Sequence, residues 1–524
     1  MTSSPTRAIQ GILVFGGAMF LAVWLGLSIV TNQFETVLQV ITAVLLIGCL
    51  AMGRRIWLLI PFAAALDIGL RIPGQPDSLL FAQILVLAFS SLLLLMRKLR
   101  CQLIFTELEF WLITLVLFVL QVYLRNPVGI SVFGGDTVGG KPYIIFTITA
   151  ISATLLTGLR VPERDLRLIL PLSILGGCLN ATISIIGHFV PAVAFYTGAS
   201  FTRTDEVDYT DHGVAVDTQA ATRINFLSTF GRNLSLWICC FVSPLRACFH
   251  PLWAGAILVS LAAVAVGGYR NGIAAVGLTY LVAIAYRSGL AGVMLSLFGG
   301  AGVIALLAIV NLAVPLPPNV QRGLTIFPGT WEQRYKDDTK DSTDWRIEIW
   351  KEALFTDRWI QNKLIGDGLG FSAAELAAQM NYREGTRLGV SGFESHREAV
   401  LSNGDYHSGP VSMIRTIGYL GLLVFVIIQI RLAVHAHRLI VRYKGTTWQP
   451  LTMLVGTPII WAPVFFLFVF GDFKNDTAFL LLSLGLIRLL QNNLPVPIPV
   501  GTQPAMGQRQ IPNRQAEVIA LRRH

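Results

Sequence analysis

Residues 404–430 read GDYHSGPVSMIRTIGYLGLLVFVIIQI, and they cross from a polar stretch into a long apolar one. The polar stretch reaches back to residue 314, whereas apolar runs dominate the chain before and after it. A stretch of this kind cannot lie in hydrocarbon, because its backbone groups would lack hydrogen-bond partners there. We therefore expect residues 314–408 to form one large, partly helical loop outside the membrane, tied at both ends to membrane spans.

The composition is that of a polytopic membrane protein. Of the 524 residues, 54% are hydrophobic and only 13% are charged, whereas soluble proteins carry about 25% charged residues. The net charge of +10 could indicate a nucleic-acid partner, but the Lys and Arg residues cluster in short loops between apolar runs. In such loops they report membrane orientation, so no nucleic acid is expected as a partner.

Apolar runs of about 17–25 residues predict an all-α polytopic fold with about twelve to fourteen transmembrane helices. The candidate spans are residues 9–30, 37–53, 56–70, 79–96, 107–124, 142–159, 168–190, 233–249, 252–268, 272–286, 290–313, 409–430, 449–470 and 476–490. They divide the chain into N-terminal helices (1–190), central helices with Arg-bearing outer loops (191–313), the large loop (314–408), C-terminal helices (409–490) and a disordered tail (491–524).

The basic residues predict the orientation. With the N-terminus inside, alternate loops hold basic clusters such as Arg54-Arg55, residues 97–100 and residues 438–444, whereas the short loops between them hold few. Positive residues concentrate in cytoplasmic loops. Both termini and the tail are therefore expected in the cytoplasm, and the loop 314–408 on the outer side of the membrane.

Four short motifs follow one another between residues 223 and 421, and the third of them has two parts. Residues 223–234 read RINFLSTFGRNL, and the turn 269–272 reads YRNG. Residues 346–350 read RIEIW, and residues 364–371 read LIGDGLGF. The last motif is His407-Ser408, followed by GYLG at 418–421.

In this order and on one side of a membrane, the motifs resemble those of the O-antigen ligase and polymerase superfamily of bacterial envelope assembly. The match covers roughly residues 220–425. Three features depart from the family pattern: Arg232 replaces a small or amide residue, Asn271 lies inside the Arg-Gly turn, and the proline before the glycine turn is missing.

The resemblance implies a membrane glycosyltransferase that moves a glycan from a polyprenyl diphosphate donor to a hydroxyl of a lipid or glycan acceptor on the periplasmic face. Ligation to a lipopolysaccharide core and polymerisation of repeat units both remain open. Departure of a diphosphate needs charge stabilisation, and guanidinium groups bind phosphate oxygens bidentately. Arg223 and Arg270 are predicted to hold the diphosphate, and the further substrate contacts are predicted at Arg232, Arg346 and Arg415.

The acceptor hydroxyl must lose a proton, and a histidine titrating near neutral pH suits that task. His407 lies at the junction of the loop and a span, so we predict that it is the general base of an inverting transfer. Asp405 is close enough in sequence to orient its ring. The outer side has no Asp-x-Asp motif or spaced His/Asp/Glu cluster, so no metal or other cofactor is predicted.

Structural interpretations stand beside these roles. Arginines at a span boundary can simply anchor headgroups, and the turn 366–370 is typical of a structural glycine turn. Apolar residues at Trp345, Ile349, Trp350 and Leu354 predict an amphipathic helix starting near residue 346. Two other function classes are open: a transporter or flippase for a lipid-linked sugar, which would have internal repeats and charges at mid-bilayer, and a glycan-binding receptor.

Overall fold

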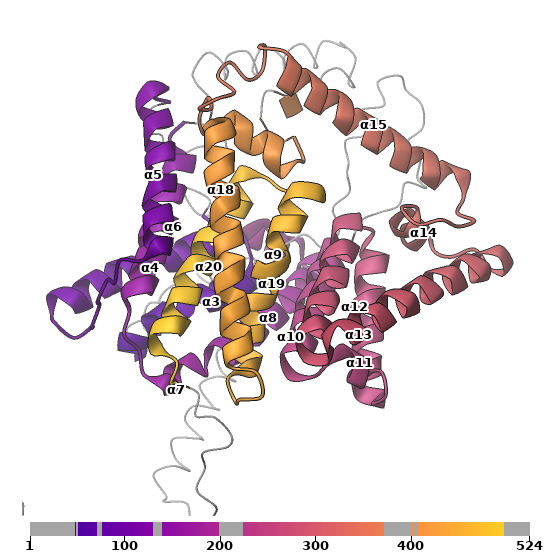
Figure 1. Cartoon of the computed structure of the whole chain (residues 1–524), viewed down its shortest axis with the longest axis horizontal. Helices are drawn as coiled ribbons and strands as arrows, with labels where there is room; N and C mark the ends of the chain where they lie inside the picture. Colours follow the sequence, from indigo (N-terminus) through magenta and orange to yellow (C-terminus); the bar gives the residue numbers. More distant parts are fainter. Residues whose placement is uncertain are drawn as a thin grey trace, which may run out of the picture.

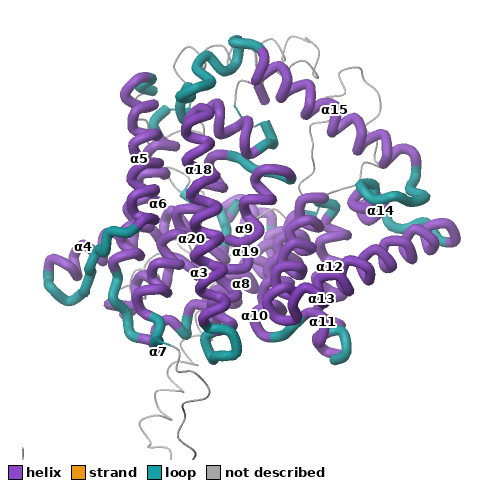
Figure 2. Tube along the Cα trace, viewed as in Figure 1, coloured by secondary structure: helices purple, strands orange, loops and turns teal. Residues whose placement is uncertain are grey.

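The computed structural model describes residues 48, 51–70, 76–128, 139–198, 224–370, 400–401, 404 and 406–496. Every regular element in these ranges is a helix (Figure 2). Six stretches are long and apolar enough to cross a membrane: Ser78–Leu95, Glu107–Arg125, Glu163–Phe189, Arg270–Ala313, Gly409–Arg442 and Gln449–Phe468. The chain is therefore an all-α polytopic membrane protein, as predicted. The larger predicted number of spans stays a prediction, because 9–30 and most of 37–53 lie outside the described residues.

The described helices are η1 (Gly53–Leu58), α3 (Leu59–Leu66), α4 (Ser78–Leu95), α5 (Glu107–Arg125), α6 (Lys141–Gly158), α7 (Glu163–Leu166), α8 (Ile169–Phe189), α9 (Pro191–Thr197), α10 (Asn225–Phe241), α11 (Pro244–Ala247), α12 (Pro251–Gly267), α13 (Arg270–Ala313), α14 (Pro318–Leu324), α15 (Gln333–Phe355), α18 (Gly409–Arg442), α19 (Gln449–Phe468) and α20 (Phe473–Asn493).

The helices pack into one bundle around the C-terminal elements. In Figure 1, α18, α19 and α20 lie between α4–α6 on one side and α10–α13 on the other. Helix α18 contacts α19, α5 and α20, and α20 packs along α6. The buried core is built from apolar residues of these helices, such as Leu156, Phe425 and Leu484. Helix α20 continues to Asn493, past the predicted end of the last span at residue 490.

The helix predicted at residues 56–70 is shorter than a span in the structure. The stretch forms η1 (6 residues) and α3 (8 residues), which follow one another directly and end at Leu66. Together they are shorter than the roughly 17–25 residues of a typical span. The next residue, Asp67, has a φ of 41°, and Asn180 of α8 donates to the carbonyls of Leu66 (2.6 Å) and Asp67 (3.0 Å).

Two long helices are bent at a glycine. Helix α13 has non-helical angles at Gly289 (φ 74°, ψ −173°), and α18 has them at Gly418 (φ 76°, ψ 178°). The expected loop between 272–286 and 290–313 is absent, and Arg287 stays in the helix. Its guanidinium donates to the carbonyls of Cys239 (3.1 Å) and Cys240 (2.5 Å) at the end of α10.

The break divides α18 into a short arm, residues 409–417, and a long arm, residues 419–442. Figure 1 shows the short arm turned aside from the long arm at one end of the bundle. The prediction of one continuous span at 409–430 is therefore wrong in its first part. At 1.5 Å per residue, the long arm reaches about 36 Å, which is enough to cross a bilayer alone.

The polar stretch is partly helical, as predicted, and contains α14 and α15. Helix α15 passes over the same end of the bundle as the short arm (Figure 1). It is amphipathic but begins at Gln333, earlier than the predicted start near residue 346. Its acidic residues Asp337, Asp341 and Asp344 are exposed, whereas Ile349 is buried in a small core beneath the helix.

Candidate functional site

His407 lies where the polar stretch meets α18. Its φ of 51° is in the left-handed region, which a residue other than glycine seldom occupies without support from its surroundings. The preceding residue supplies that support: the indole Nε1 of Trp350 donates to the carbonyl of Tyr406 at 2.8 Å, and the Tyr406 N–H donates to Ser412 Oγ at 3.3 Å. His407 is thus held by contacts to α15 and to the short arm.

Two aromatic rings contact the imidazole of His407. The ring of Phe470, which follows α19, is stacked on it with centroids 5.9 Å apart. The ring of Trp345 of α15 lies 6.3 Å away at 39°. Residues of three elements that are distant in sequence therefore meet at His407. Trp345 and Phe470 contribute aromatic rings, and sugar rings stack on rings of this kind.

Arg346 follows Trp345 on α15. Its side chain is partly buried, and burial lowers the pKa of the guanidinium. Within the part of the chain that the structure describes, no carboxylate pairs with Arg346. A partly desolvated cation in this state would gain from an anionic ligand, since charge-assisted bonds to phosphate or carboxylate oxygens are the strong ones.

Arg415 belongs to the short arm and is 5% exposed. Its Nη1 donates to the carbonyl of Gly368 at 3.4 Å, and its side chain runs so close to Gly404 that a Cβ atom there would collide with it. Arg415 lies in the part of α18 before the break, within the apolar stretch Gly409–Arg442 in which a span was predicted. The bend at Gly418 places this arginine between the polar stretch and the bundle.

The glycine-rich motif of the polar stretch fits into the break of α18. We call residues 361–369 the docked turn. Asp367 and Gly368 donate their N–H groups to the carbonyls of Arg415 (2.7 Å) and Thr416 (3.1 Å). In return, the N–H groups of Tyr419 (2.8 Å) and Leu420 (3.2 Å) bind the carbonyls of residues 363 and 364.

The close approach explains the glycines on both sides. A Cβ atom at Gly418 would collide with the carbonyl of Leu364, and one at Gly366 would lie 2.5 Å from the Thr416 carbonyl oxygen. The docked turn is also braced internally, because the Asp367 carboxylate accepts the N–H groups of residues 361 (2.7 Å) and 362 (2.9 Å). The prediction that this motif is structural agrees with these contacts.

Side chains of α5 and α6 hold the docked turn from the other side. Gln121 donates to the Ile365 carbonyl at 3.0 Å, and Arg125 binds the Gly366 carbonyl. The hydroxyl of Tyr143, near the start of α6, accepts the Leu369 N–H at 2.8 Å. The sequence could not reveal these partners, which lie more than 200 residues before the turn.

Arg232 and Arg270 form a second group of candidates at the α10–α13 side of the bundle. Arg232 lies on α10 and interacts electrostatically with Asp67, at the end of α3, and with Tyr269. Arg270 is the first residue of α13, directly after Tyr269. The N–H of Ile224 donates to the Gly267 carbonyl at 3.1 Å, so the start of α10 lies against the turn that leads to Arg270.

The predicted site residues are thus brought together in two groups. His407 precedes the short arm, Arg415 belongs to it, and Arg346 follows Trp345 on α15; in the second group, Arg232 interacts with Tyr269, the residue before Arg270. The contacts described above do not link one group to the other. Arg223 and Asp405 lie outside the described residues. Among the described residues, no cluster of three or more His, Cys, Asp or Glu side chains could hold a metal ion.

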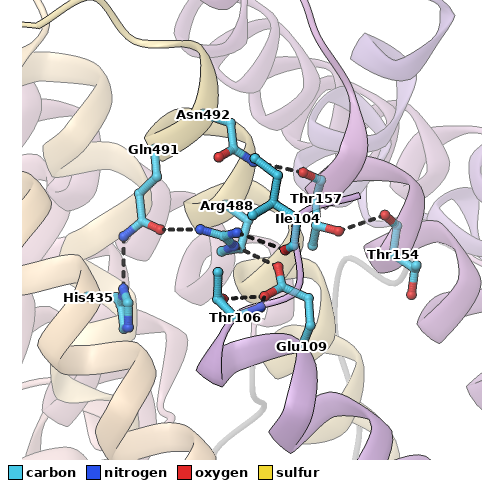
Figure 3. A network of polar contacts seen from close by, with 9 residues as sticks. All are labelled: Ile104, Thr106, Glu109, Thr154, Thr157, His435, Arg488, Gln491 and Asn492. Carbon is cyan, nitrogen blue, oxygen red and sulfur yellow. Dashed lines mark hydrogen bonds and ion pairs between the residues drawn. The ribbon is translucent and has the colours of Figure 1, made fainter. Parts of the chain in front are cut away.

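A charged network occupies the opposite end of α5 (Figure 3). The guanidinium of Arg488 donates from Nε to Glu109 at 2.7 Å, from Nη1 to Gln491 at 3.2 Å and from Nη2 to the Ile104 carbonyl at 3.3 Å. Gln491 also binds Nδ1 of His435 at 2.9 Å. The network joins α5, α18 and α20, and sequence reasoning missed it because its members are 379 positions apart.

Comparison with protein families and with curated proteins gives no match for this chain. The function is therefore inferred from the residues and their geometry.

Proposed function

We propose that the protein is an integral membrane glycosyltransferase of envelope polysaccharide assembly, of the O-antigen ligase or polymerase type. It transfers a glycan from a polyprenyl diphosphate donor to an acceptor hydroxyl on the periplasmic face. The observation that carries the proposal is the group around His407: one imidazole in contact with the rings of Trp345 and Phe470, and a guanidinium without a described acidic partner on Arg346, the residue after Trp345.

Each part of this group suits one part of the transfer. The acceptor hydroxyl oxygen attacks the anomeric carbon, and His407 takes the hydroxyl proton. The bond from that carbon to the diphosphate oxygen breaks, and the electron pair leaves with the diphosphate. Guanidinium groups stabilise the charge that develops there, a role that we assign to Arg346, which adjoins Trp345 on α15. Because attack is direct, the anomeric configuration inverts.

The test is transfer by the purified protein in liposomes, with a synthetic undecaprenyl diphosphate-linked disaccharide as donor. Replacing His407→Ala should lower kcat about 10²–10⁴-fold, the usual contribution of a general base, while donor binding persists. His188→Ala serves as the matched control, because this histidine ends α8 beside Phe189 and away from the short arm. Full activity of His407→Ala would refute the proposed role.

A transporter or flippase for a lipid-linked sugar is the second candidate. The bent helix α18 favours it, because interrupted helices occur in transporters. The same liposomes separate the two classes. A transporter would move a fluorescent lipid-linked sugar across the bilayer without forming product, and His407→Ala would leave that movement unchanged.

A further inference from the structure

The docked turn supplies hydrogen-bond partners for the backbone groups that the bend in α18 leaves free. A helix break frees carbonyls on one side and N–H groups on the other, and at a membrane boundary these groups need partners. Four backbone hydrogen bonds from the docked turn supply them, two to each arm of α18. The bend and the turn therefore depend on each other.

The docked turn in turn depends on Tyr143. The Tyr143 hydroxyl is the acceptor for the Leu369 N–H, and a Cβ atom at Gly368 would lie 2.6 Å from the same hydroxyl oxygen. Arg415 closes the arrangement, because it donates to the Gly368 carbonyl and passes against Gly404. A chain of direct contacts thus leads from α6 through the docked turn to the short arm.

We propose that Tyr143 and the docked turn are positioning elements: they fix the short arm of α18, and with it Arg415 and His407, relative to spans α5 and α6. Tyr143 touches neither His407 nor a reacting atom in this arrangement, and it acts through residues 366–369. The kinetic part of this inference rests on the proposed function, whereas the structural part does not.

The structural part is tested by a cross-link that needs no substrate. Leu364 and Leu420 are joined by a backbone hydrogen bond, and their side chains are 58% and 42% exposed. The pair Leu364→Cys and Leu420→Cys should form a disulfide under mild oxidation, read by peptide mass spectrometry, since Cα atoms about 5.5 Å apart suit that bond. The matched control pairs Leu364→Cys with Leu423→Cys, which is 57% exposed and lies one turn further along the long arm.

The kinetic part is tested by Tyr143→Phe, which removes only the hydroxyl that accepts the Leu369 N–H. We expect kcat to fall about tenfold to a hundredfold, as misplaced catalytic groups do, with the donor KM changed less than about twofold. Tyr123→Phe is the control, because the Tyr123 ring packs edge-on against Tyr143 at 4.9 Å and its loss of a hydroxyl leaves the Leu369 acceptor in place.

Each outcome has one meaning. Failure of the 364–420 pair to cross-link more readily than the 364–423 pair would overturn the inference, whatever the activity. In an active protein, equal kcat for the two phenylalanine variants would overturn it as well. If the 364–420 cysteine pair cross-links as expected but the wild-type protein makes no product, the proposed function is refuted and the position of the docked turn is established.

Discussion

Arg488 of α20 and Glu109 of α5 form a buried ion pair. Their side chains are 8% and 10% exposed and lie 2.7 Å apart. Removing one partner leaves the other charge buried and uncompensated, which costs about 3–5 kcal/mol. We therefore expect Arg488→Leu to lower the free energy of unfolding by about that amount, measured by reversible unfolding in mixed micelles.

The double variant Arg488→Leu with Glu109→Leu should recover most of that loss, because it leaves no lone buried charge. Glu163→Ala is the surface control. Its partner Arg167 lies 2.8 Å away, but the two side chains are 62% and 45% exposed, so the loss should stay within about 1 kcal/mol. If Arg488→Leu lowered the free energy of unfolding no more than Glu163→Ala does, the buried pair would not stabilise the fold as its burial indicates.

At the residue scale, the sequence could locate some of the site but not its neighbours. His407 is visible in the sequence because a polar stretch ends beside it. Phe470 and Tyr143 are not, because their roles come from contacts between distant segments. The sequence placed Arg415 within a span by counting from the start of an apolar run, but it could not show the bend at Gly418 or the contacts of Arg415 with Gly368 and Gly404.

At the element scale, the two kinked helices offer a matched pair of glycines. Gly289 and Gly418 have nearly the same backbone angles, so replacement by alanine should strain both by about 1–3 kcal/mol. At Gly289 nothing lies within 4 Å of the added Cβ atom, whereas at Gly418 it meets the Leu364 carbonyl. We expect Gly418→Ala to expel the docked turn and Gly289→Ala to leave it in place.

The 364–420 cross-link measures this difference directly. It should be lost in Gly418→Ala and retained in Gly289→Ala, and thermal unfolding should show the larger shift for Gly418→Ala. Equal cross-linking in both variants would mean that the collision is relieved without moving the docked turn.

Apolar patterning predicts helices well and their ends poorly. The stretch 56–70 is as apolar as a span, yet it ends as a short buried helix because Asp67 takes a left-handed conformation and Asn180 satisfies the exposed carbonyls. A lone glycine such as Gly418 is also uninformative, because glycine is common in transmembrane helices. What decides the break is a segment some fifty positions earlier.

At the scale of the whole molecule, the orientation is the prediction on which the function depends. Asp337 of α15 and Arg164 of α7 are both exposed, and the positive-inside rule places them on opposite faces. A membrane-impermeant maleimide should label Asp337→Cys in intact cells and Arg164→Cys only after lysis, with the unmodified chain as background. The reverse pattern would put the polar stretch in the cytoplasm and remove the proposed periplasmic reaction.

The docked turn also constrains how the protein is made. Residues 361–369 leave the ribosome before α18, whose break they fill, so this segment must wait for α18 to be made. Biogenesis therefore cannot finish one helix at a time in the order of synthesis. Helix α18 and the docked turn therefore become stable together, and only after residue 420 has been inserted.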